Sequence, residues 1–372
     1  MANSNLDYGI NNKIGNKEVF LAVPSMILGV GILNLPRALS TQLHTSDGWI
    51  SIILASSITA FFSWVIIKLA LTAGDDSILQ FTSKTLAKPV GYVLAFLFFI
   101  HFFSYCFYET RALANLAKHF LFDRTPVEVI ALLFLWLVFY AVSGSRTALI
   151  RLNVMFFPIV LLILFMIILF NLREFEFGNI KPMFVTDIPS ILKGSYDTIF
   201  SFLGFEVLFF YVAMLDKKQS SKNISLYPII GIGLLTFIYV LVYIFSIAIF
   251  TVEGAGALLY PTLELAKVVE FPGGILERLE SLFFTVWVMT IFNTTAMSMD
   301  IAVYCLQFLI PKVKRITCIL IILPLIYISS MLPQNLLQLQ QAGEYLGYSG
   351  IVVAIIIPSI LFILTKVKGG TK

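Results

Sequence analysis

Long apolar segments separated by short polar links run along almost the whole chain. A helix needs roughly 20 apolar residues to cross a membrane, and ten segments approach or exceed this length. The pattern predicts an all-α polytopic membrane protein, and the link at 253–274 has room for one further short helix. The ten predicted transmembrane helices occupy residues 18–40, 49–73, 90–120, 127–145, 149–171, 191–215, 225–251, 275–301, 315–332 and 345–366.

Two of the predicted helices are interrupted near their middle. The first contains Gly-Val-Gly at residues 29–31, and the sixth contains Gly-Phe-Glu at residues 204–206. A broken helix exposes backbone groups that lipid cannot satisfy, so these groups must face protein, water or a ligand. Matching breaks in two halves of a chain point to a transporter-like binding site. For either break alone, close packing of glycine against a neighbouring helix is the alternative.

Lysine and arginine are unequally distributed over the connections. If the N-terminus is cytoplasmic, the inner connections carry about twice as many as the outer ones, which favours both termini inside. Ten spans then divide into two halves of five, and an odd number per half inserts the second half upside down. The expected organisation is an inner tail at 1–17, a repeat at 18–171, an outer linker at 172–190, a repeat at 191–366 and an inner tail at 367–372.

Composition agrees with a protein embedded in a lipid bilayer. Hydrophobic residues make up 59% of the 372 residues and charged residues only 12%, about half the charged share of a soluble domain. Cys106, Cys305 and Cys318 lack metal-ligand spacing, so we expect buried packing residues. The chain also lacks a phosphate loop, a dinucleotide fingerprint and a nucleophilic triad. We therefore expect no enzyme, metal or cofactor, and the basic inner clusters set topology without implying nucleic acid.

Polar side chains follow one face of the third predicted helix. His101, Tyr105, Tyr108 and Glu109 share this face. Such a stripe can line a cavity or move protons, whereas a lone membrane histidine is often a hydrogen-bonded packing residue. Glu109 and Arg111 are expected near the outer interface, where long side chains extend toward water.

The second half also carries polar groups at membrane depth. Glu206 lies near the centre of the sixth predicted helix, where a carboxylate is costly and a functional role is the default. A protonated glutamate bonded to a neighbouring helix is the structural alternative. In the eighth helix Thr290, Thr294 and Ser298 share a face beside Asn293. These groups can contact a cation or substrate, or bond between helices as serine and threonine often do.

Several motifs carry a family resemblance. The sequences GVGILNLP and FSFLGFE resemble the broken first and sixth helices of the amino acid–polyamine–organocation superfamily. GNIKPMF, YPTLELAKVVEFPGGILERLESLFFTVWV, MLPQNLLQL and YLGYSG are more specific. Together they are similar to the B subunit of spore germinant receptors, the endospore germination permease family, over nearly the whole chain.

The resemblance implies a LeuT-like fold of five plus five helices in the inner membrane of a bacterial spore. It implies recognition of small nutrients, often amino acids, and partnership with a receptor A subunit and a lipoprotein C subunit. Substrate carboxylate recognition would carry over to Val30 and Gly31 beside Gly29. Some superfamily members carry a lysine in the fifth helix, but residues 153–170 contain none, which argues against lysine-based proton coupling.

Three hypotheses follow for the function. The first is a germinant sensor that binds a nutrient and signals by conformational change. The second is a proton-coupled amino acid transporter in which Glu206 or His101 handles the proton, and the third is a structural or ion-conducting subunit with a vestigial pocket. The candidate ligand-binding residues are Gly29, Val30, Gly31, His101, Tyr105, Phe202, Gly204, Glu206, Thr290, Asn293 and Thr294.

Overall fold

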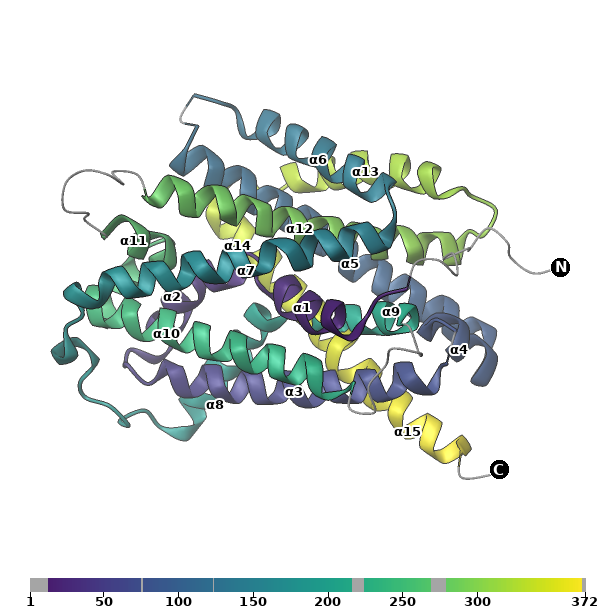
Figure 1. The fold of residues 1–372 in the computed structure, drawn as a ribbon, viewed down its shortest axis with the longest axis horizontal. Helices are drawn as coiled ribbons and strands as arrows, with labels where there is room; N and C mark the ends of the chain where they lie inside the picture. The colour runs from purple at the N-terminus through teal and green to yellow at the C-terminus, as the bar shows by residue number, and fades with distance from the viewer. Residues whose placement is uncertain (1–12, 75, 123, 216–223, 269–278, 370–372) are drawn as a thin grey trace.

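The described part of the chain is almost entirely helical, and its helices pack into one elongated bundle (Figure 1). Most of the predicted 1–17 tail and half of the 367–372 tail lie outside the described residues, as does the 275–278 start of the eighth predicted helix. The computed structural model describes residues 13–74, 76–122, 124–215, 224–268 and 279–369.

The helices follow the predicted apolar segments closely. The short helix expected in the 253–274 link is present as α11. Two short 3-10 helices, Phe200–Phe202 and Phe205–Val207, join α8 to α9, and the π-helical stretch Val352–Ile356 continues α14 into α15. In chain order the helices are α1 (Asn16–Ile27), α2 (Gly31–Leu43), α3 (Gly48–Thr72), α4 (Ile78–Thr85), α5 (Lys88–Phe120), α6 (Val127–Ser143), α7 (Arg146–Phe170), α8 (Ile188–Ile199), α9 (Leu208–Tyr211), α10 (Leu226–Ala257), α11 (Pro261–Val268), α12 (Leu279–Leu309), α13 (Arg315–Met331), α14 (Leu336–Ile351) and α15 (Ile357–Gly369).

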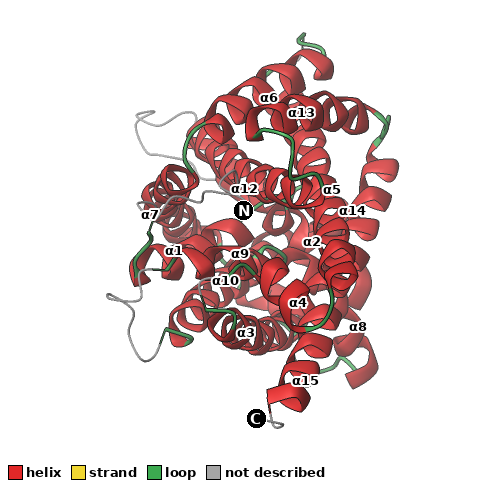
Figure 2. Ribbon diagram, turned by 90° about the vertical axis from the view of Figure 1, so that its right-hand side faces the viewer, coloured by secondary structure: helices red, strands yellow, loops and turns green. Residues whose placement is uncertain are grey.

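Each predicted span position holds a helix or a bent pair of helices. Six helices of the described residues are long and apolar enough to cross a membrane: α3, α5, α7, α10 with a kink at Thr251, α12 and the α14–α15 helix. Two pairs also qualify, α1 with α2 bent by 50° and the α8 segment with the α9 segment bent by 52°. The apolar helices α6 and α13 occupy the two remaining positions and lie side by side at one margin of the bundle (Figure 2).

Two predicted boundaries were wrong. The eighth span was expected to end at residue 301, but α12 continues to Leu309, because the apparent polar stop at Asp300 is buried and ion-paired with Arg146 and Arg315. The tenth was expected to begin at 345, but α14 begins at Leu336, where the Asn335 side chain caps it by accepting from a backbone N–H at 2.9 Å.

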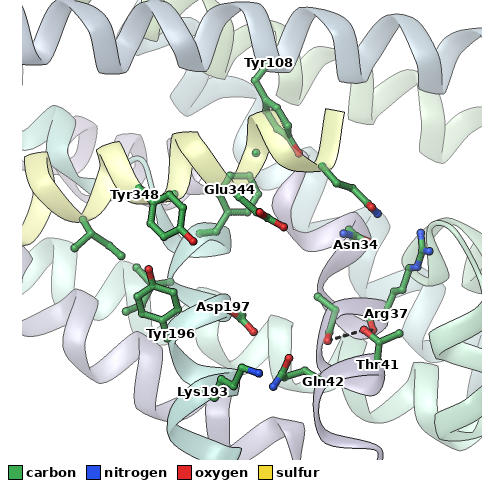
Figure 3. A pocket seen from close by; sticks show the side chains of 17 residues that line it. Asn34, Arg37, Thr41, Gln42, Tyr108, Lys193, Tyr196, Asp197, Glu344 and Tyr348 are labelled. Atoms are coloured by element: carbon green, nitrogen blue, oxygen red, sulfur yellow. Dashed lines mark hydrogen bonds between the residues drawn. The ribbon is translucent and has the colours of Figure 1, made fainter. Parts of the chain in front are cut away.

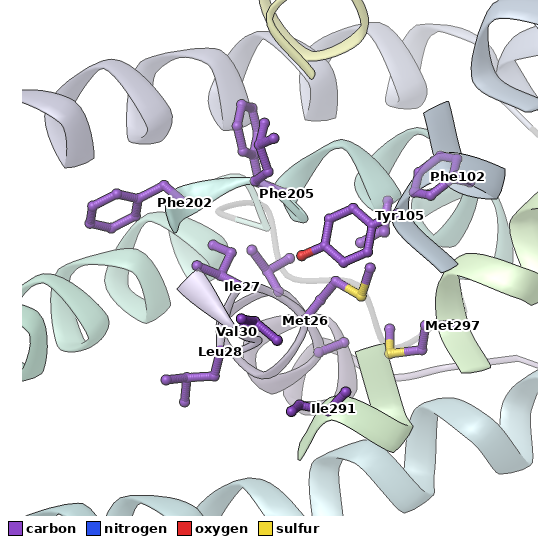
Figure 4. Close-up of a cluster of buried hydrophobic side chains, with 14 of the residues drawn as sticks. Met26, Ile27, Leu28, Val30, Phe102, Tyr105, Phe202, Phe205, Ile291 and Met297 are labelled. Atoms are coloured by element: carbon purple, nitrogen blue, oxygen red, sulfur yellow. The ribbon is translucent and has the colours of Figure 1, made fainter. Parts of the chain in front are cut away.

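The two helix breaks pack against each other at glycine residues. A Cβ atom on Gly31 would lie 2.8 Å from the Cα atom of Ser201, and one on Gly204 would lie 3.0 Å from the Met26 carbonyl oxygen. Gly204 also has φ +123°, which L side chains rarely adopt. Figure 4 shows the broken segment of α1 beside Phe202 and Phe205. Only glycine therefore allows this approach of the two backbones.

The two ends of the bundle are held by different contacts. At one end, called the Ile14 end, the Ile14 N–H donates to the Met214 carbonyl at 3.0 Å, so the ends of the two broken spans are joined. The opposite end, called the linker end, holds the α2–α3 connection and the 172–187 segment. There the Asp47 carboxylate accepts backbone N–H groups from residues 184–186 at 2.6–3.0 Å.

Candidate functional site

Helix α5 supplies side chains to both helix breaks. At the second break, Glu206 Oε2 accepts the Gly204 N–H at 2.8 Å, and Glu206 Oε1 lies 2.9 Å from His101 Nε2. The other ring nitrogen of His101 lies 2.9 Å from the Ser349 hydroxyl, and both His101 and Glu206 are fully buried. The acid predicted at mid-membrane thus satisfies the unwound backbone and meets the predicted histidine.

At the first break, the carboxylate of Glu109 sits against the start of α2. The Val30 N–H lies 3.4 Å from Glu109 Oε1, and a Cβ atom on Gly29 would lie only 2.7 Å from that oxygen. Glu109 is 2% exposed. The prediction that its side chain extends toward water was therefore wrong: α5 continues for three more turns to Phe120, and this residue is buried inside the bundle.

Arg111 was also expected to extend toward water, and that prediction was wrong as well. Its guanidinium donates to the Met331 sulfur of α13 at 3.5 Å, and the residue is only 8% exposed. Helices α6 and α13 both pack against α5, and Met331 of α13 lies against Arg111. Sequence spacing located the polar face of α5 but not the helices that bury it.

Two tyrosines complete the surroundings of the breaks. Tyr105 points its hydroxyl toward the broken segment of α1, and a Cβ atom on Gly29 would lie 3.6 Å from it (Figure 4). Tyr239 of α10 lies within reach of a carbonyl from each break, Ile27 at 3.4 Å and Ser201 at 3.2 Å. Sequence analysis missed Tyr239, because nothing in an apolar helix marks which tyrosine meets freed carbonyls.

A cavity of about 580 Å³ lies on the linker side of the breaks, between α2, α5, α8 and α14 (Figure 3). Its lining carries both signs of charge, with Arg37 and Lys193 on one hand and Asp197 and Glu344 on the other. The Asn34 carboxamide oxygen is buried there without a hydrogen-bond partner among the described groups. Such volume, with few convergent polar groups, is typical of a small-molecule site.

A smaller cavity of about 50 Å³ leads from the large one toward the first break. It is lined by Val30, Gly31 and Ser201, and it shares Tyr108 and Phe200 with the large cavity. The rings of these two aromatic residues meet edge to face with centroids 5.7 Å apart. The pair thus lies where the two cavities adjoin.

The polar cluster of α12 bonds mainly to its own helix. The Thr290 hydroxyl donates to the Val286 carbonyl at 3.2 Å and the Thr294 hydroxyl to the Ile291 carbonyl at 2.9 Å. The Asn293 amide nitrogen is buried without a partner in the described part of the chain. None of Thr290, Asn293 and Thr294 lines either cavity above, so their role in ligand binding stays a prediction.

The remaining candidates lie at the breaks themselves. Phe202 is fully buried and packs against Tyr239 with ring centroids 5.1 Å apart. The three cysteines are buried and free, in agreement with the packing role predicted for them. Within the described ranges, no group of three or more histidine, cysteine or acidic side chains is placed to hold a metal ion.

Comparison with known sequences points to one family. A family model described as "Spore germination protein" matches residues 13–339. Spore germination protein GerLB of Bacillus cereus is 36% identical over 365 residues, covering 97% of this chain and 96% of the relative. Spore germination protein YndE of Bacillus subtilis (strain 168) is 28% identical over 355 residues, covering 95% of this chain and 97% of the relative.

Two solved structures align with nearly the whole chain. MhsT in complex with L-phenylalanine aligns with a TM-score of 0.68 at 13% identity, covering 94% of this chain and 97% of that one. A mutant manganese transporter of Eremococcus coleocola aligns with a TM-score of 0.65 at 15% identity, covering 93% of this chain and 78% of that one. These likenesses confirm the predicted LeuT-like fold with its two broken helices.

Proposed function

Since this chain belongs to the spore germination protein family, we propose that it senses a small nutrient, in particular an amino acid. The nutrient binds between the two helix breaks and biases the conformation of a germination receptor. The observation that carries this proposal is the small cavity, which reaches Val30 and Gly31 at the foot of the large one. Backbone groups freed at a break are natural ligand contacts, because lipid cannot satisfy them.

The charges of the large cavity support a zwitterionic ligand. Arg37 and Lys193 offer partners for a carboxylate, and Asp197 and Glu344 offer partners for an ammonium group. MhsT, which shares the fold, was solved in complex with L-phenylalanine, and this likeness supports a ligand of that class. The route into the site runs from the linker end, which the predicted topology places outside the membrane.

Binding alters the receptor if the two states of the breaks differ in affinity for the nutrient. The Tyr108–Phe200 contact stands between the cavities, and the Ile14–Met214 hydrogen bond closes the other end. In this proposal, opening the Tyr108–Phe200 contact or the Ile14–Met214 hydrogen bond lets one of the two broken spans move. We propose that this motion is read by a receptor A subunit and a lipoprotein C subunit in the inner spore membrane, with both termini cytoplasmic.

A proton-coupled amino acid transporter is the second candidate, and the buried His101–Glu206 pair favours it. A histidine and a carboxylate in contact can exchange a proton with a bound substrate. The two functions differ in one measurement: a transporter reconstituted in vesicles accumulates labelled amino acid against a gradient, and a sensor does not.

The proposal is tested by ligand-dependent stabilisation of the purified full chain in lipid nanodiscs. The twenty amino acids and a set of sugars are screened by thermal shift, since a ligand that binds only the native state raises its stability. Gly31→Leu, which places a side chain against Ser201, is expected to abolish the response, whereas Gly233→Leu on an open face of α10 is expected to keep it. Absence of any stabilising nutrient contradicts the proposal.

A further inference from the structure

One carboxylate oxygen of Glu109 is buried without a hydrogen-bond partner in the described part of the chain. The residue is 2% exposed, and its other oxygen faces the Val30 N–H at 3.4 Å. No described basic side chain forms an ion pair with it. Burying a carboxylate in this way is costly unless a donor or a positive charge reaches it.

The geometry of the break is built around this carboxylate. A Cβ atom on Gly29 would lie 2.7 Å from Glu109 Oε1, so glycine at this position leaves room for the acid where it now lies. The acid thereby reaches the N-terminus of α2, a helix of 13 residues whose first N–H groups favour an anion. A ligand carboxylate brought to the same place would meet a like charge. The position at the start of α2 that was predicted to bind the ligand carboxylate is thus occupied by the carboxylate of Glu109.

The acid at the other break is different. Glu206 has both oxygens in contact, one with the Gly204 N–H and one with His101. Glu109 therefore retains bonding capacity that Glu206 lacks. Glu109 itself lines neither cavity, but the small cavity reaches Val30, whose N–H faces Glu109 Oε1 at 3.4 Å.

We propose that Glu109 binds the ammonium group of the ligand, so that the site selects small primary amines and zwitterions by the amine and not by the carboxylate. This inference rests on the proposed function. A zwitterion bound in this sense directs its carboxylate toward the large cavity. Arg37 lines that cavity, and its Nη1 is buried with no hydrogen-bond partner among the described groups.

The test separates the two ligand groups. L-Alanine, ethylamine and propionate form one set of probes, and L-phenylalanine, phenethylamine and 3-phenylpropionate form a second. Binding of each probe to the full chain in nanodiscs is measured by calorimetry. We expect the amino acid and the amine of at least one set to bind, and both carboxylates to fail. Glu109→Gln, which keeps the size of the side chain, is expected to weaken the amine by at least about tenfold.

The controls keep the inference open to contradiction. Glu174→Gln changes an exposed acid outside the cavities, and we expect it to leave every affinity unchanged. The wild-type comparison of amine with carboxylate does not depend on the folding of any variant. If amino acids and propionate bind but the amines do not, the ammonium assignment is wrong while the sensor proposal stands. If the thermal-shift screen finds a stabilising nutrient but neither amine binds, the ammonium assignment is wrong while the sensor proposal stands, and if the screen finds none, both are contradicted.

Discussion

Gly31 and Ser201 meet backbone to backbone, so closely that a Cβ atom on Gly31 would lie 2.8 Å from the Cα atom of Ser201. Each residue belongs to one of the two broken spans. Their contact joins the breaks into one site, because groups 170 positions apart in sequence become neighbours. The Ser201 hydroxyl strengthens the contact by donating to the Gly31 carbonyl at 3.3 Å.

Replacing Gly31 by alanine is expected to force the two breaks apart. Overpacking of this kind costs about 1–3 kcal/mol, since the atom in the way is backbone and cannot rotate aside. The measurement is the thermal midpoint of the purified chain. Gly233→Ala is the matched control, because nothing lies within 4 Å of a Cβ atom at that position. Equal midpoints for the two variants would mean that the contact is not tight.

Replacing Tyr239 by phenylalanine removes a hydroxyl that serves a carbonyl at each break. The one O–H donor within reach of these two buried carbonyls is then lost, and we expect a loss of about 1–3 kcal/mol in unfolding free energy. Tyr140→Phe, at a position 82% exposed, is expected to be neutral. The unfolding free energies of both variants are measured by denaturant titration in the same detergent. An unchanged value for Tyr239→Phe would contradict the prediction.

His101 and Glu206 are expected to behave as one coupled unit. Each single variant, His101→Gln or Glu206→Gln, disturbs the buried contact of 2.9 Å between the two side chains. In the double variant the second substitution costs less, because the contact is already lost. The double-variant cycle should therefore show an interaction of at least about 0.5 kcal/mol. Thermal and denaturant unfolding supply the four values. Strict additivity would show that the two side chains are energetically independent despite their contact.

Asp47 makes the linker end sensitive to acid. Burial raises the pKa of its carboxyl, but hydrogen bonds from the backbone of Phe184, Thr186 and Val185 and from the Thr186 hydroxyl outweigh it and hold the pKa below the ordinary 3.8. Because the folded-state pKa is depressed, the stabilisation is fully present above the ordinary value. It is lost as the pH falls through the lower folded-state value.

Asp47→Asn should therefore destabilise the chain at pH 7 and lose this effect in strong acid. Midpoints of wild type and variant are compared at pH 7, 5, 3 and 2, and we expect the difference between them to shrink only below the ordinary aspartate pKa. Asp76→Asn is the control, since that carboxylate forms a partly exposed ion pair with Lys84. A difference independent of pH would show that Asp47 contributes by shape alone.

The sequence pattern predicted the helices and both breaks well. Apolar length locates a membrane helix, and glycine within the apolar run marks where it unwinds, so both features are local. Two helix ends were predicted wrongly, the end of α12 and the start of α14. Asp300 has the character of a surface residue, yet two arginines from α7 and α13 allow it to be buried. A polar residue is a reliable boundary only when no partner from another helix reaches it.

At the candidate site too, the sequence could not show which partners from other helices bury a polar residue. The periodicity of α5 correctly placed His101, Tyr105 and Glu109 on one face. It did not predict how deeply each side chain is buried. Glu109 and Arg111 were expected near the outer interface with their side chains extended toward water, and the structure buries both. Tyr239 carried no local signal at all, because its role depends on carbonyls freed by two distant breaks.

By itself the sequence determined that this chain is a helical membrane protein with two unwound spans, since hydrophobic length and glycine content act within each segment. The family resemblance carried in its motifs was confirmed by the family match. Only the tertiary structure decided what faces each break: Glu109 against Val30, and Glu206 against His101. The reason is physical, because backbone groups freed in one helix are satisfied by side chains of another, and that pairing exists only once the helices have packed.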